Sequence, residues 1–173
     1  SAGRESPGLT DGVTETIKEL SILTLRAALP EVLRFGDWEM RHREFALVRL
    51  RGSSGAEGFG FTLTREAPIA GAIRQAVAHH YVGATSSAAA EIETLFYRCQ
   101  GSNLASLASG AGLRSLSIVD LAAYDLFAKA SEISIVRLLG GTHRSLPATA
   151  IVGRSELRRT CRPTTWRFVR PFR

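Results

Sequence analysis

The sequence has few of the residues on which redox and metal chemistry depend. Its 173 residues include two cysteines, one methionine and four histidines. Cys99 and Cys161 are far apart and have no metal-binding or redox spacing, so we expect a reduced, cytoplasmic protein with incidental thiols. No apolar run reaches the roughly 18 residues of a membrane span, which argues against a membrane partner. Residues 1–16 lack the apolar region of a secretory signal, and we expect them to form a polar leader.

Lysine is almost absent, and the positive charge is confined to one end. The formal net charge is +6, and residues 154–173 hold seven arginines and one acid, so this segment accounts for all of it. A neutral body argues against a nucleic-acid-binding domain, because that function needs a basic face on the fold itself. The Arg-rich tail with its interleaved aromatics is compatible with a polyanion-binding patch. It has no lysine and two prolines, however, and we favour a reading-frame change or an artificial junction near Gly153 as its origin.

The first half of the body shows the period-two pattern of β-strands. Ile17–Ala27 alternates as one strand that Pro30 should end, and residues 29–43 then read as a long connection. Residues 45–51 and 57–63 follow as two more strands joined by a turn. In the last of these strands, Gly58 and Gly60 indicate a bulge or a close backbone approach.

The second half is helical. Pro68 suits the first turn of a helix that Gly83 ends, and Ser86 or Ser87 can cap a second one. After a looser stretch over residues 101–112, a long helix has one apolar stripe at helical spacing and an Asp125–Lys129 pair. The stripe consists of Leu116, Val119, Ala123, Leu126, Phe127 and Ala130. The order of elements predicts an α+β fold, a three-stranded antiparallel sheet followed by a helical bundle.

Several possible chemical sites fail on spacing. The GAEGFGF run at residues 55–61 lacks the spacing of a phosphate-binding loop and does not open a helix. Asp120 and Asp125 lie about 140° apart around a helix, so they do not converge. We expect Asp125 to pair with Lys129, and Asp120 to lie near the early part of the helix, where the dipole favours an acid. His79 and His80 have no further ligands at metal-binding spacing, which favours a structural role at a helix end.

The stretch SLSIVDLAAYDLFAKASEISIVRLLGG at residues 115–141 resembles the end of the N-terminal capping domain in the mandelate racemase and muconate lactonizing enzyme group of the enolase superfamily. The resemblance runs back through the hairpin glycines to Ile17. It implies a capping domain at residues 17–145 and, at residues 146–153, the first strand of a (β/α)8 barrel. Residues 154–173 depart from the family pattern.

The resemblance implies chemistry on a hydroxy acid or acid sugar. Enzymes of this group remove a proton next to a carboxylate with a lysine or histidine base, and Mg²⁺ stabilises the intermediate. The cap supplies two substrate-facing loops, at about residues 29–38 and 62–67. The substrate-binding side chains implied by this resemblance are Arg34, Phe35, Trp38, Thr64 and Arg65. Arg65 is the best carboxylate partner, because a guanidinium can donate two parallel hydrogen bonds.

The segment after the predicted capping domain is too short to form the catalytic barrel. A (β/α)8 barrel needs about 200 residues or more, and only 26 follow Pro147. We therefore assign no catalytic residue, no metal ligand and no cofactor to this chain, although Mg²⁺ is expected in the full-length family. The expectation is a truncated, inactive cap of an acid-sugar dehydratase or, less favoured, a racemase. The alternatives are a non-catalytic interaction module that binds a partner or associates with itself, and a polyanion binder acting through the tail.

Overall fold

The protein is described by a computed structural model in which residues 13–146 are placed. The described residues up to Thr142 form one compact unit, and His143 and those after it belong to a second. The predicted leader lies almost entirely outside the described residues, as do the Arg-rich tail and all of the predicted barrel strand except Leu146.

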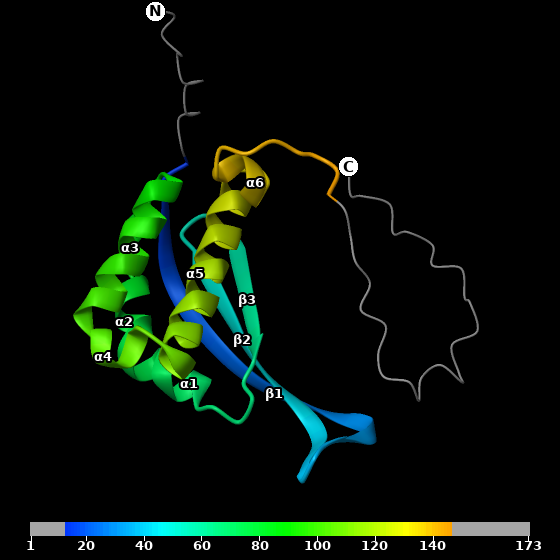
Figure 1. Ribbon diagram of the computed structural model, residues 1–173. Helices are drawn as coiled ribbons and strands as arrows, with labels where there is room; N and C mark the ends of the chain where they lie inside the picture. Colours follow the sequence, from blue (N-terminus) through cyan, green and yellow to red (C-terminus); the bar gives the residue numbers. More distant parts are fainter. Residues whose placement is uncertain (1–12, 147–173) are drawn as a thin grey trace, which may run out of the picture. The chain divides into compact units, whose positions relative to one another are not determined.

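A four-stranded antiparallel sheet forms one layer, with the strand order β3-β2-β1-β4 (Figure 1). The strands are β1 (Glu15–Phe35), β2 (Trp38–Gly52), β3 (Glu57–Leu63) and β4 (Thr85–Ser86). The predicted α+β class is confirmed. The expected three strands are present, and the two-residue β4 adds a fourth by pairing with the start of β1.

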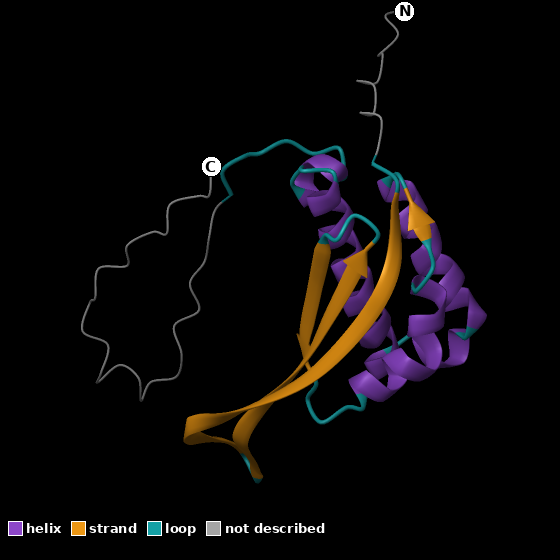
Figure 2. Cartoon of the chain, turned by 180° about the vertical axis from the view of Figure 1, so that it is seen from behind, coloured by secondary structure: helices purple, strands orange, loops and turns teal. Residues whose placement is uncertain are grey.

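The prediction that Pro30 ends the first strand was wrong. β1 continues to Phe35, and Gly36, with φ 63°, begins the tight turn into β2. Ala28 pairs with His42 and Leu33 with Met40, so the residues from Leu29 to Val32 face Arg41 alone. This bulge accommodates Pro30, which has no N–H to donate to the ladder. The expected connection at residues 29–43 is therefore an arm, the distal part of the β1–β2 hairpin, which projects beyond the helical layer (Figures 1 and 2).

The helical layer lies on one face of the sheet, as both ribbon views show (Figures 1 and 2). Its elements are α1 (Ile69–Ala72), the π-helical turn η1 (Ile73–Val77), α2 (Ala78–Tyr81), α3 (Ala89–Ser102), α4 (Leu104–Leu107), α5 (Gly110–Ala130) and α6 (Ile135–Leu138). The single helix predicted between Pro68 and Gly83 is interrupted by η1. The stretch predicted to be loose holds α4 and the first turn of α5.

The helix α5 packs its predicted stripe directly onto the sheet. Every member of that stripe is buried except Ala130, which is partly exposed. Gly58 and Gly60 lie under this helix, and a Cβ at either position would collide with the carbonyl oxygen of Ala122 or Ile118. The expected close backbone approach is confirmed, and it brings α5 down onto β3.

The core lies between the two layers. The helix-facing residues Ala46, Val48 and Leu50 of β2 are fully buried together with Ile17 of β1. Residues between them along β2 point to the opposite face, since successive side chains of a strand alternate. This alternation gives the sheet one covered face and one that no helix in the described part of the chain covers.

Candidate functional site

The main hollow of interest lies where the arm leaves the sheet. It has a volume of about 600 Å³, and β2 lines one side of it. The end of β3 and the segment that follows it supply the rest of the lining. The lining residues are Met40, His42, Arg43, Glu44, Leu63, Arg65 and Glu66. We refer to this hollow as the arm pocket.

The backbone beside the arm pocket is held in an unusual conformation. Arg65 and Glu66 have φ angles of 50° and 65°, in the left-handed region that non-glycine residues seldom occupy. Such residues cost about 1–3 kcal/mol each and persist only where the surrounding structure fixes them. Strain of this kind clusters at ligand-binding sites, which marks the pair as functional candidates.

Neighbouring groups hold this strained segment in place. The buried Thr64 donates its N–H to the carbonyl oxygen of Glu44 (2.9 Å) and its hydroxyl to the Glu44 Oε1 (2.8 Å). From α5, Arg114 Nη1 donates to the carbonyl oxygens of Leu63 (3.3 Å) and Thr64 (3.4 Å). The loop is thus anchored to β2 on one side and to α5 on the other.

The charges around the pocket suit an anion. Hydrogen bonds from Thr64 and then Arg26 hold the pKa of Glu44 below its usual range, so this carboxylate stays ionised and already has partners. Among the residues that the structure describes, neither Arg43 nor Arg65 has a salt-bridge partner within 4.0 Å. Two guanidinium groups without an ion-pair partner therefore line the same hollow as the carboxylates of Glu44 and Glu66, and either guanidinium can bind a carboxylate.

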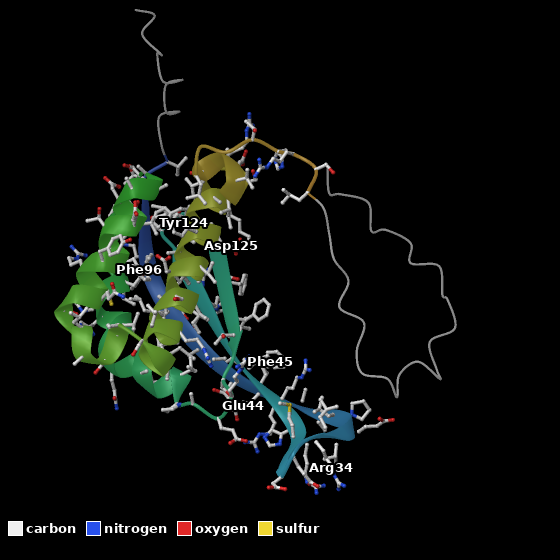
Figure 3. All side chains as sticks on the ribbon, in the orientation of Figure 1. Arg34, Glu44, Phe45, Phe96, Tyr124 and Asp125 are labelled. Atoms are coloured by element: carbon white, nitrogen blue, oxygen red, sulfur yellow. The ribbon has the colours of Figure 1, made fainter. Side chains whose placement is uncertain are left out.

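The predicted substrate-binding residues fall into two places. Arg65 lines the arm pocket and Thr64 lies beneath it, with its hydroxyl engaged by Glu44. Arg34 lies toward the far end of the arm, where it pairs with Glu39 at 2.8 Å (Figure 3). Phe35 and Trp38 pair across the turn at the arm tip, but their side chains lie outside the described residues. That these five residues contact a substrate stays a prediction.

The prediction missed residues on both sides of the pocket. His42 and Arg43 were assigned to a connection, although the alternation seen from Phe45 onward could have been followed back to them. Figure 3 shows Glu44 and Phe45 at the level where the arm begins. Nothing in the sequence pointed to Arg114, because its role depends on how α5 crosses the end of β3.

The two aspartates of α5 diverge, as predicted. Asp125 accepts a hydrogen bond from the backbone N–H of Phe59 (2.9 Å) and pairs with Lys129 Nζ (2.6 Å), which confirms the expected pair. Asp120 instead faces the hydroxyl of Tyr81 at 3.5 Å. Its expected place in the early part of the helix was wrong, because α5 begins at Gly110 and puts Asp120 in mid-helix. Burial there raises the pKa of Asp120 to about 6.

The described residues offer no donor set for a divalent metal. No group of three or more His, Cys, Asp or Glu side chains among them converges on one point. His80 accepts or donates a hydrogen bond with the Ser102 hydroxyl (2.8 Å), and burial lowers its pKa. The described residues therefore do not fit Mg²⁺. In the placed part of the chain, no helix is long and apolar enough to cross a membrane.

One protein family has a model that matches most of this chain. The family model for the mandelate racemase / muconate lactonizing enzyme N-terminal domain matches residues 17–140. No curated protein matches the chain.

Similar solved structures belong to larger proteins. L-Talarate dehydratase from Polaromonas sp. JS666, complexed with Mg and L-glucarate, is 19% identical over 75% of this chain and 36% of its own, with a TM-score of 0.63. L-Talarate/galactarate dehydratase from Salmonella typhimurium LT2 is 18% identical over 83% of this chain and 38% of its own, with a TM-score of 0.63. A racemase from Streptomyces coelicolor A3(2) with bound magnesium is 25% identical over 64% of this chain and 31% of its own, with a TM-score of 0.56. The chain spans about a third of the length of the structures it matches.

Proposed function

The chain belongs to the mandelate racemase / muconate lactonizing enzyme N-terminal domain family, and on that premise we propose that it is the substrate-capping domain of an enzyme acting on a hydroxy acid or acid sugar. In this proposal the domain binds and orients the substrate. The groups that remove the proton next to the carboxylate lie outside residues 17–146. We favour an acid-sugar dehydratase over a racemase.

The observation that carries this proposal is the arm pocket. Arg65 presents a guanidinium from a strained, doubly anchored segment, and Arg43 lies on the same hollow. A carboxylate accepts two hydrogen bonds from one guanidinium in a fixed geometry, so such a group can orient the acid end of a substrate. A prepositioned loop loses less freedom on binding, which leaves more of the interaction energy for affinity.

The ligands named for similar proteins support the chemical class. The Polaromonas enzyme was solved with L-glucarate. A Bradyrhizobium enolase that is 18% identical to this chain was solved with magnesium and mandelic acid. Both ligands are carboxylic acids with a hydroxyl group, and the polar and apolar lining of the arm pocket can accommodate either kind.

Ligand-observed NMR tests the proposal. Saturation of the protein should transfer to L-glucarate or to mandelate when the full chain is present. Arg65→Gln removes the charge with little loss of volume. We expect binding to weaken at least about tenfold, since charge-assisted hydrogen bonds contribute about 1.5–3 kcal/mol.

Arg74→Gln is the matched control, because Arg74 is exposed on η1, away from the pocket lining. It should leave the transfer unchanged. Equal binding by the Arg65→Gln variant, or no transfer from the unaltered chain to either acid, would contradict a substrate site at the arm pocket.

A further inference from the structure

A tight turn places Arg65 beside the arm pocket. The N–H of Ala67 donates to the carbonyl oxygen of Thr64 (3.0 Å), so residues 64–67 form a four-residue turn that is closed by a hydrogen bond between its first and last residues. The two central residues, Arg65 and Glu66, both have positive φ angles. This is the pattern of a type I′ turn, the mirror image of the common type I turn.

The residue types in this turn do not suit its conformation. Type I′ turns favour glycine, asparagine and aspartate at the two central positions, because other residues are strained there. The Arg65–Glu66 pair therefore opposes the conformation that it occupies, and an isolated turn of this sequence would relax to negative φ angles. Contacts from outside the turn must hold it in place.

These contacts come from α5 and from β2. Arg114 Nη1 donates to the carbonyl oxygens of Leu63 (3.3 Å) and Thr64 (3.4 Å). The Thr64 carbonyl is also the one that closes the turn, so Arg114 binds the turn at its own hydrogen bond. On the other side, Glu44 accepts the N–H and the hydroxyl of Thr64. These two bonds fix the first residue of the turn without contacting its carbonyl oxygen.

The start of α5 is packed firmly enough to support the turn. The buried Ser115 places its hydroxyl 3.3 Å from the carbonyl oxygen of Ile69 in α1. A Cβ at Gly112 would collide with the carbonyl oxygen of Ser106 in α4. In Figure 1 the segment between β3 and α1 passes close to these first turns of α5. Two consecutive residues, Arg114 and Ser115, therefore contact the two ends of that segment.

We propose that Arg114 is a positioning residue for the arm pocket. Its guanidinium keeps residues 64–67 in the left-handed turn, and the turn presents the Arg65 guanidinium to the carboxylate of a substrate. Arg114 itself lies outside the lining of the arm pocket, so it acts through Arg65. The proposal rests on the proposed function, because it takes an acid as the ligand of this pocket. The apparent affinity for that acid falls with the fraction of molecules in which the turn is formed.

NMR of the full chain, with and without L-glucarate, tests this role. Arg114→Met removes both hydrogen bonds and keeps most of the side-chain volume. A positive φ brings the N–H and Hα of one residue close together, so the nuclear Overhauser effect between them is strong. We expect this effect to weaken at Arg65 and Glu66 in the variant. The dissociation constant for L-glucarate should rise about tenfold, as the population of the turn falls to about a tenth.

Arg74→Met is the matched control. It removes the same charge from an exposed position on η1, and it should leave the turn and the affinity unchanged. A second variant separates positioning from a purely structural contact. Glu66→Gly supplies a residue that adopts positive φ without strain. Arg114→Met should therefore raise the dissociation constant by a smaller factor in the Glu66→Gly background than in the unaltered chain.

Three results would overturn the positioning role. The first is an Arg114→Met variant with a lower melting temperature but an unchanged turn and unchanged affinity, since Arg114 would then be a structural contact only. The second is an equal loss of affinity in both backgrounds, and the third is a turn that persists at Arg65 without Arg114. Failure of the unaltered chain to bind L-glucarate would contradict the proposed function instead. The nuclear Overhauser effects of the turn would still decide whether Arg114 holds it.

Discussion

At the residue scale, the half-buried carboxyl of Asp120 should make the stability of the domain depend on pH. It lies between three elements, facing Tyr81 of α2, Glu93 of α3 and Tyr124 of its own helix. Burial raises its pKa from 3.8 to about 6, since the charged form is poorly solvated there. The folded state therefore holds a proton on Asp120 at pH values where the unfolded chain has lost it.

This shift predicts how stability changes with pH. Between about pH 4 and pH 6 the folded state binds more protons than the unfolded state, so the contribution of Asp120 to the free energy of unfolding falls as pH rises. The loss reaches at most about 3 kcal/mol above pH 6. Asp120→Asn should remove this dependence and be the more stable protein at neutral pH, as urea unfolding at several pH values would show. A constant difference between the two proteins across that range would contradict it.

A second residue-scale prediction concerns the glycines under α5. Gly60→Ala forces a methyl group against the carbonyl oxygen of Ile118, and such overpacking costs about 1–3 kcal/mol. Gly71→Ala is the matched control, because nothing lies within 4 Å of a Cβ there and the position is helical. Thermal unfolding should show a lower melting temperature for the first variant and an equal or higher one for the second. Equal melting temperatures would mean that α5 does not pack this closely on β3.

At the element scale, α5 contributes both to the core and to the contacts that hold β3 and the segment after it. Its buried stripe forms much of the core, and its polar side chains secure the edge of β3 and the segment beside the arm pocket. Lys129 adds to the contacts at the edge of β3, since its ammonium lies 5.0 Å from the centre of the Phe59 ring and donates to the carbonyl oxygen of Glu57. One helix therefore couples core packing to the geometry of the candidate site.

The edge contact predicts a local change in dynamics. Asp125→Ala removes the acceptor of the Phe59 N–H, so hydrogen exchange at the Phe59 amide should accelerate while amides in the centre of β2 stay protected. Asp125→Asn keeps an acceptor oxygen and should show a smaller effect. Unchanged exchange at Phe59 in the alanine variant would show that this bond does not protect the edge.

The elements that depend on local periodicity could be predicted from the sequence. The elements whose conformation is set by contacts between distant residues could not. The stripe of α5 and the close approach at Gly58 and Gly60 were readable because helical spacing and strand glycines are local signals. The bulge at Pro30 was not readable, because it depends on the pairing with β2. A strand continues through a proline only where the partner strand leaves that residue out of the hydrogen-bonded ladder. The arm pocket was half predicted: Arg65 followed from the family resemblance, whereas Arg43 depended on recognising the arm as a strand.

At the scale of the whole molecule, the two surfaces of the domain have different chemistry. The arm pocket is a charged hollow at the base of the arm, whereas the sheet face turned away from the helices carries the exposed apolar side chains of Leu23, Leu25, Phe59 and Phe61. The helical layer covers the opposite face of the sheet. Its helix α5 also contacts the edge of β3 and the segment beside the arm pocket.

The central claim, that the arm pocket holds the carboxylate of a hydroxy acid, is tested most directly by following the backbone amide resonances of the full chain during titration with L-glucarate. We expect progressive shifts in residues 42–44 and 63–66, with little change in α3. In the Arg65→Gln variant the shifts should need about tenfold more ligand. Shifts spread evenly over the surface, or confined to another part of the domain, would contradict the claim.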